Sequence, residues 1–186
     1  MLSATTPDRS ELAAAESLLN DRCEALILIY VEVVRTALEH LVSLGHRDIA
    51  HLDGGSIHGA TDRRRSYRTL MRRHDLAQYT KVYPGGNTEA DGIRSAELVL
   101  AEPRPPTAVI AFNDRSAVGF MFELRRAGVS IPEDISVVGY DDITMAALPF
   151  IDLTTVGQDA TATADMPSST YPDVSRRAPP PEMKDS

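Results

Sequence analysis

The chain has 186 residues, of which 42% are hydrophobic and 25% are charged, a composition typical of a globular domain. Its formal net charge of -8 disfavours electrostatic binding of nucleic acid, because such binding depends on Lys and Arg side chains that neutralise phosphates. Cys23 is the only cysteine, which excludes an intrachain disulfide, and no apolar run approaches the roughly 20 residues that span a bilayer.

The first 45 residues predict a helix, a buried strand and a second helix. Residues 10–20 have apolar side chains at helical spacing, and residues 25–30 form a continuous apolar run. Residues 31–44 carry an apolar stripe, and Gly45 is placed to end that helix. No secretory signal is visible near Met1, so we expect a cytoplasmic protein.

Strands and helices then alternate along most of the chain. Strands are predicted over residues 48–52, 80–83, 108–112 and 135–140, and helices over residues 61–74, 88–100 and 115–127. This alternation predicts an α/β fold, with a parallel sheet and helices on both faces. Residues 160–186 are rich in Thr, Ala, Ser and Pro, and we expect a disordered tail there.

Short polar residues follow two of the predicted strands. Asn113 and Asp114 come after residues 108–112, and Asp141 and Asp142 come after residues 135–140. In an open α/β sheet, ligands bind outside the carboxyl ends of the strands. The Asn113 amide and the Asp141 carboxylate suit the hydroxyls of a sugar. Asp114 and Asp142 are expected to cap helices, Asp142 at the start of residues 143–148, although capping could also explain Asn113.

These motifs resemble the C-terminal subdomain of the LacI/GalR family of sugar-responsive transcription regulators. The resemblance rests on residues 107–114, 135–142 and 154–158, and on the sequence motif Leu44-Gly-His-Arg-Asp-Ile-Ala50. It implies a periplasmic-binding-protein-like fold of type I. Residues 1–30 would be a partial N-terminal subdomain, residues 31–159 the C-terminal effector-binding subdomain, and residues 160–186 the tail.

The resemblance also implies four ligand-binding residues. Asn113 and Asp141 match the family's effector-contacting Asn and Asp, and Gln158 matches a residue near the hinge and the pocket. Arg63 is the best match to the family's effector-contacting Arg. Its neighbours Arg64 and Arg65 are alternatives, and a solvated helix face is a competing interpretation of all three. Asn87 stands where many members place an aromatic residue that stacks on the sugar.

The chain departs from the family pattern in three places. No helix-turn-helix DNA-binding domain is visible, Tyr30 runs directly into Val31 where the family has further strands and helices, and residues 160–186 do not resemble the family. We therefore expect a truncated sensor that retains one wall of its cleft and makes no direct contact with DNA.

The sequence favours an effector-sensing domain of a LacI-type regulator that binds a sugar or a related metabolite and pairs as a homodimer, with residues 115–127 as a contact. No catalytic motif, metal-ligand spacing or cofactor loop is present, so neither an enzyme nor a cofactor is expected. The alternatives are a transport-type sugar-binding protein of the same fold and an inert gene fragment. Residues 131–142, which look characteristic of regulators, count against the transport protein.

Overall fold

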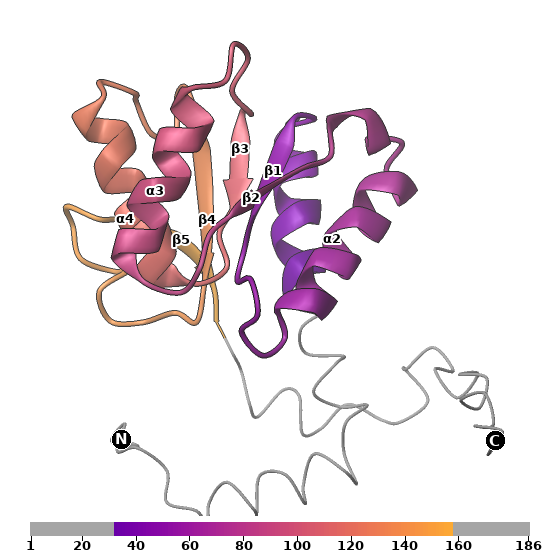
Figure 1. The fold of residues 1–186 in the computed structure, drawn as a ribbon, viewed down its shortest axis with the longest axis horizontal. Coiled ribbons are helices and arrows are strands. Elements are labelled where there is room, and N and C mark those ends of the chain that lie inside the picture. The colour runs from indigo at the N-terminus through magenta and orange to yellow at the C-terminus, as the bar shows by residue number, and fades with distance from the viewer. Residues whose placement is uncertain (1–31, 158–186) are drawn as a thin grey trace, which may run out of the picture. The chain divides into compact units, whose positions relative to one another are not determined.

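The computed structural model describes residues 32–157, which form a parallel sheet with helices on both faces (Figure 1). Residues 32–43 are helical. The other elements are β1 (Ile49–Asp53), α2 (Ala60–Arg73), the 3-10 helix η1 (Ala77–Tyr79), β2 (Lys81–Pro84), α3 (Glu89–Leu100), β3 (Ala108–Ile110), α4 (Asp114–Arg126), β4 (Ser136–Tyr140) and β5 (Thr154–Val156).

The strand order is β2-β1-β3-β4-β5, and every neighbouring pair is parallel. The α/β fold with a parallel sheet, predicted from the alternation of strands and helices, is therefore confirmed. The expected helix over residues 10–20, the strand over residues 25–30 and the tail lie outside the described residues. So do the predicted N-terminal subdomain and all of the predicted domain limits.

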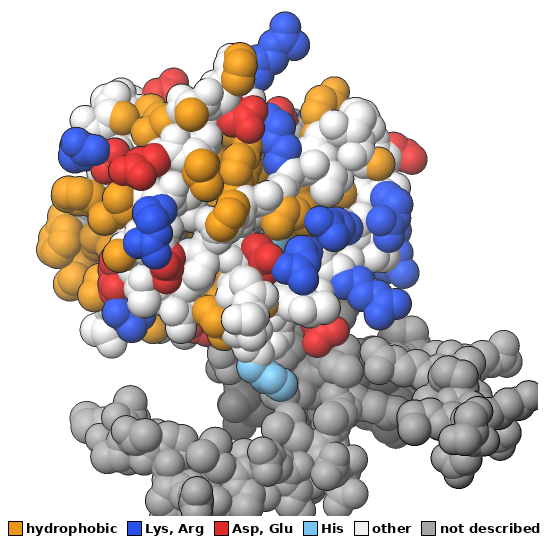
Figure 2. Space-filling model, viewed as in Figure 1, with side chains coloured by type: hydrophobic (Ala, Val, Ile, Leu, Met, Phe, Trp, Pro, Cys, Tyr) orange, Lys and Arg blue, Asp and Glu red, His pale blue; other side chains and the backbone are white. Residues whose placement is uncertain are grey.

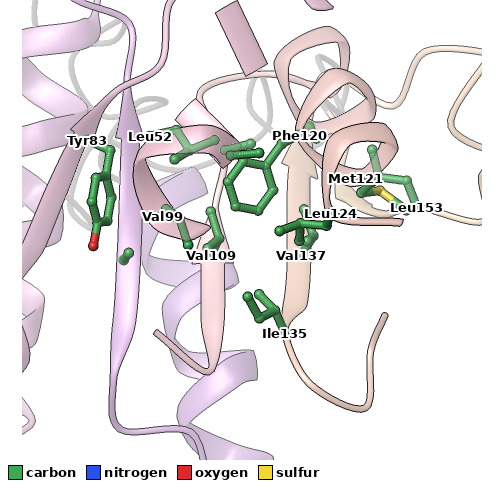
Figure 3. Packing of buried hydrophobic residues seen from close by; sticks show 14 of the residues in the cluster. Leu52, Tyr83, Val99, Val109, Phe120, Met121, Leu124, Ile135, Val137 and Leu153 are labelled. Carbon is green, nitrogen blue, oxygen red and sulfur yellow. The ribbon is translucent and has the colours of Figure 1, made fainter. Parts of the chain in front are cut away.

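Alternating residues of the strands divide the core into two clusters, one on each face of the sheet. In β3, Val109 belongs to the cluster under α3 and α4, whereas Ala108 and Ile110 belong to the cluster under α2 and the helix over residues 32–43. This is the two-residue period that a pleated strand imposes. Figure 3 shows Phe120 and Val137 gathered with Val109 between α4 and the sheet.

The helices α3 and α4 pack backbone to backbone at two glycines. A Cβ atom on Gly92 would lie 2.0 Å from the Ser116 carbonyl oxygen, and one on Gly119 would lie 1.9 Å from the Glu89 carbonyl oxygen. Only glycine permits so close an approach. Since both contacts involve the beginning of a helix, they set the loops that precede α3 and α4 side by side at the carboxyl edge of the sheet.

The segment after β4 differs from the prediction. Residues 143–150 contain turns and no helix. Their hydrogen bonds run from Ala146 N to Ile143 O and from Leu148 N to Met145 O, as in single turns. Pro149 then follows, and proline disfavours helical geometry in the residue before it.

Candidate functional site

Polar residues converge at the carboxyl edge of the sheet, where β1, β3 and β4 end. Asp53 ends β1, Asn113 follows β3, and Asp141 follows β4. Because all the strands are parallel, their carboxyl ends share one edge. The structure thus brings Asn113, Asp114, Asp141 and Asp142 to one edge, as the strand pattern predicted.

Arg63 reaches this edge from the first turn of α2. Its side chain is buried, and its guanidinium carbon lies 4.5 Å from the centroid of the Phe112 ring and 4.1 Å from that of Tyr140. The guanidinium also donates to the Phe112 carbonyl oxygen. A cation held against two aromatic faces is attracted by their quadrupoles. The solvated-face interpretation is therefore wrong for Arg63.

The two alternatives to Arg63 lie elsewhere. Arg64 forms an ion pair with Asp53, and Arg65 is exposed. Of the three adjacent arginines, Arg63 alone contacts the rings of Phe112 and Tyr140. These rings were not identified from the sequence, although both occupy the last apolar position before a polar pair.

The sequence favoured Asp114 as the residue that caps α4, and this prediction is wrong. Asn113 is the N-cap of α4, and its side-chain oxygen accepts from Ser116 N at 2.9 Å. The Ser116 hydroxyl oxygen in turn accepts from the backbone N–H of Asn113. The Asn113 amide nitrogen donates to Asn87 O at 3.1 Å. Both ends of the Asn113 side chain thus have partners in the protein, and this capping alternative was one the sequence left open.

Asp114 ties three segments together instead of capping α4. It is fully buried, and its two carboxylate oxygens accept from the Thr155 hydroxyl at 2.6 Å and from Ile143 N at 2.9 Å. It thereby fastens β5 and the loop after β4 to the start of α4. A Cβ atom on Gly139 would lie 2.2 Å from Asp114 Oδ1, so the carboxylate also needs a glycine in β4.

Asp141 and Asp142 are exposed and both have positive φ angles, 112° and 53°. The backbone N–H of Asp141 donates to Val156 O at 3.2 Å. An N-cap residue has extended backbone, so the prediction that Asp142 caps a helix is wrong. Positive φ is uncommon outside glycine and clusters at functional sites, which makes this turn notable at the edge where a ligand is expected.

The turn after β1 packs closely against the turn after β2 and against Phe112. The Asp53 carbonyl oxygen accepts from Gly85 N at 2.8 Å and from Gly86 N at 2.9 Å. A Cβ atom on Gly54 would lie 2.4 Å from the Phe112 ring. Close packing thus explains the glycine, while the Asp53 carboxylate, paired with Arg64, lies at the same edge.

His51 of β1 is a buried ionisable group behind this edge, for which the sequence suggested no role. Its Nδ1 lies 3.1 Å from Ile110 O, its ring centroid lies 5.4 Å from that of Tyr67, and Nε2 has no hydrogen-bond partner among the described residues. Burial lowers the pKa of His51 from 6.5 to about 4. The imidazole is therefore neutral at neutral pH.

Gln158, the fourth predicted ligand residue, lies outside the described residues. Within residues 32–157, no three His, Cys, Asp or Glu side chains are grouped as a metal site. No helix in that same range is both long enough and apolar enough to cross a membrane.

Comparison with known proteins assigns the family. Residues 38–166 match the periplasmic binding protein-like domain. The HTH-type transcriptional repressor PurR of Vibrio campbellii is 39% identical over 124 residues, which are 66% of this chain and 37% of that protein. The HTH-type transcriptional regulator AscG of Escherichia coli is 35% identical over 113 residues, or 59% of this chain and 33% of that protein.

A solved structure agrees with this assignment. The crystal structure of a LacI transcriptional regulator from a Rhodococcus species is 47% identical with a TM-score of 0.69, over 73% of this chain and 50% of that one. The chain thus spans about a third of the length of these curated relatives and half of that solved chain. The chain belongs to the periplasmic binding protein-like domain family, and it carries the sensor domain of the LacI type of transcriptional regulator.

Proposed function

We propose that the carboxyl edge of the sheet is one wall of a small-molecule site, and that a sugar or related hydroxylated effector bound there regulates transcription. The observation that carries the proposal is Arg63, which is buried against Phe112 and Tyr140, while the exposed Asp141 directly follows Tyr140 in the chain. A guanidinium donor and a carboxylate acceptor at one edge match the acceptors and donors of neighbouring hydroxyls. The PurR relatives are named as transcriptional repressors, which supports a role in regulating transcription.

Within this proposal Asp141 accepts effector hydroxyls, and Arg63 donates to the effector while bracing the ends of β3 and β4. Asn113 contributes its amide from a position that the capping box fixes. We include Gln158 through its match to the family pattern. We infer that the domain binds its effector without changing it chemically, and that it acts in the cytoplasm, where a regulator meets DNA. Effector binding would bias an equilibrium between two conformations of the sensor.

A second proposal concerns assembly. Phe122 on α4 is 58% exposed and Phe150 is 71% exposed. Arg125 donates to the carbonyl oxygens of Phe150 and Ile151 at 3.0 and 3.2 Å, which holds that loop against α4. Figure 2 shows hydrophobic side chains collected at the left margin, on the side of α4. We propose that this face pairs two copies of the chain, since apolar patches of this kind mark interfaces.

One of the solved structures supports the assembly proposal. It is a lac repressor dimer bound to operator and an anti-inducer, 32% identical to this chain with a TM-score of 0.65 over 70% of it. Light scattering coupled to gel filtration tests the pairing. Phe122→Ser with Phe150→Ser should give the mass of a monomer, whereas Tyr79→Ser, at an exposed position in η1, should leave a dimer. A monomeric unmodified chain would refute it.

Thermal melting with a panel of monosaccharides tests effector binding. A ligand present at about 100 times its Kd stabilises the folded state by about 2.7 kcal/mol, so one panel member should raise Tm in a saturable manner. Asp141→Ala should remove the rise, and Asp142→Ala, the exposed neighbour, should retain it. The effector proposal fails if no sugar shifts Tm, or if both variants respond alike.

A further inference from the structure

The outward face of α2 carries four exposed arginines, Arg65, Arg68, Arg72 and Arg73. With 100° and 1.5 Å per residue, Arg65, Arg68 and Arg72 fall within an arc of about 60° and a length of about 10 Å. We call these three residues the arginine face. Figure 2 shows a group of blue side chains on the side of the molecule where α2 lies. The helix has six arginines in all and one acidic residue, Asp62.

The other described helices place arginines beside carboxylates. The ion pairs are Arg35 with Glu32 and Glu39, Arg94 with Asp91, Arg126 with Glu123, and, between α3 and α4, Arg115 with Glu89. No such pair forms between the arginine face and any residue in the range 32–157. The contrast shows that α2 concentrates positive charge that this part of the protein does not neutralise.

Helix stability does not explain this concentration. Arg72 and Arg73 lie in the last turn, where the helix dipole favours cations. Arg65 and Arg68 lie nearer the beginning, where that benefit is lost. Moreover, Arg65 and Arg68 are three residues apart, and Arg68 and Arg72 are four apart, spacings at which like charges repel. The arrangement therefore costs stability in isolation and would gain it beside an anionic partner.

We propose that the arginine face docks an acidic segment of another protein, in which three carboxylates lie within about 10 Å, as they do on two turns of a helix. Guanidinium groups bind carboxylates through two parallel hydrogen bonds, which gives such a contact both strength and register. The contact is independent of the effector site, because Arg63 and Arg64 are the arginines of α2 that face the sheet edge.

Two observations favour a protein segment over nucleic acid. The chain has a net charge of -8, which opposes the approach of an extended polyanion but much less that of a short acidic segment. The aromatic residue of α2, Tyr67, is fully buried, so the helix offers no ring on which bases could stack.

Fluorescence anisotropy with the full chain tests the proposal. The probe is a labelled helical peptide with glutamate at positions i, i+3 and i+7, and a scrambled peptide of the same composition controls for register. In low salt, Arg65→Glu with Arg68→Glu should weaken peptide binding by about tenfold or more. Arg47→Glu with Arg104→Glu makes the same charge change at exposed positions elsewhere and should change Kd by less than about twofold.

Further variants and competing ligands decide whether the arginine face binds an acidic protein segment. If circular dichroism shows that the glutamate variant is unfolded, Arg65→Gln with Arg68→Gln removes the charges without adding new ones and should still weaken binding. Equal affinity for the scrambled peptide, equal loss in the control variant, or no binding by the unmodified chain would overturn the proposal. Tighter binding of duplex DNA, lost in the same arginine variants, would assign the face to nucleic acid and overturn it too.

Discussion

The face of the sheet that α3 and α4 cover is packed mainly by hydrocarbon, and its buried carboxylate, Asp114, accepts two hydrogen bonds from the protein. The face that α2 covers buries an imidazole, a guanidinium and a phenol hydroxyl, those of His51, Arg63 and Tyr67. Glycine contacts fix the first face. Hydrogen bonds and ring stacking organise the second, and they continue to the edge where a ligand is expected. The difference indicates that one face is a rigid support and that the other carries the groups able to respond to a ligand or to pH.

The first prediction tests the rigid face. Gly119→Ala should destabilise the protein by about 3 kcal/mol, because the new methyl group would meet the Glu89 carbonyl oxygen and force the two helices apart. Helix propensity alone predicts the opposite sign, a gain of about 1 kcal/mol. Urea unfolding distinguishes the two, and a more stable variant would show that α3 and α4 are not in backbone contact.

The second prediction tests the polar face. The Tyr67 hydroxyl donates to Ile49 O at 2.7 Å and accepts from Lys81 N at 3.0 Å. Tyr67→Phe leaves both backbone groups without this partner, and we expect a loss of about 2 kcal/mol in the free energy of unfolding. Tyr79→Phe, at a partly exposed tyrosine, is the matched control and should be nearly neutral. Equal effects in the two variants would contradict the importance of the buried hydroxyl.

The third prediction concerns pH on the polar face. Burial lowers the pKa of His51 from 6.5 to about 4, so the unfolded chain binds more protons than the folded one between these values. His51 therefore contributes stability that is present above pH 6.5 and lost as the pH falls toward 4. Between pH 7 and pH 5 this loss is about 2 kcal/mol.

His51→Asn keeps a donor for Ile110 O and should flatten that part of the pH dependence. Urea titrations of both proteins at pH 7 and pH 5 provide the measurement. Any constant cost of the substitution cancels when each protein is compared with itself. If both proteins lose the same stability on acidification, another group is responsible.

The smallest expected effect lies at the candidate site. Asn113→Ala removes the cap of α4 and should cost about 1 kcal/mol. Asn113→Ser can still cap, so it should recover most of the stability. The same pair separates capping from ligand contact: if the serine variant is stable yet loses a sugar-dependent rise in Tm, the amide contacts the ligand. Full retention of that rise would limit Asn113 to its structural role.

Much of the fold could be predicted because its signals are local. Val109 alternates with Ala108 and Ile110, and helical stripes such as Tyr67, Leu70 and Met71 recur at the helical period. The expected element limits fall within about two residues of those observed, the usual uncertainty of helix ends. The failure at residues 143–148 has a local cause as well, in the positive φ of Asp142 and in Pro149.

The sequence by itself determined the order and type of most elements from residue 32 to residue 157, and the edge at which the polar residues meet. It did not predict η1 or β5, and the helix that it predicted over residues 143–148 does not form. Tertiary structure decided which of these side chains cap a helix, which are buried and which are exposed. Asn113 caps α4 while the adjacent Asp114 fastens β5, and Arg63 is buried while the adjacent Arg65 is exposed. Neighbouring residues of similar chemistry give the same local signal, and only the contacts made by distant segments distinguish them.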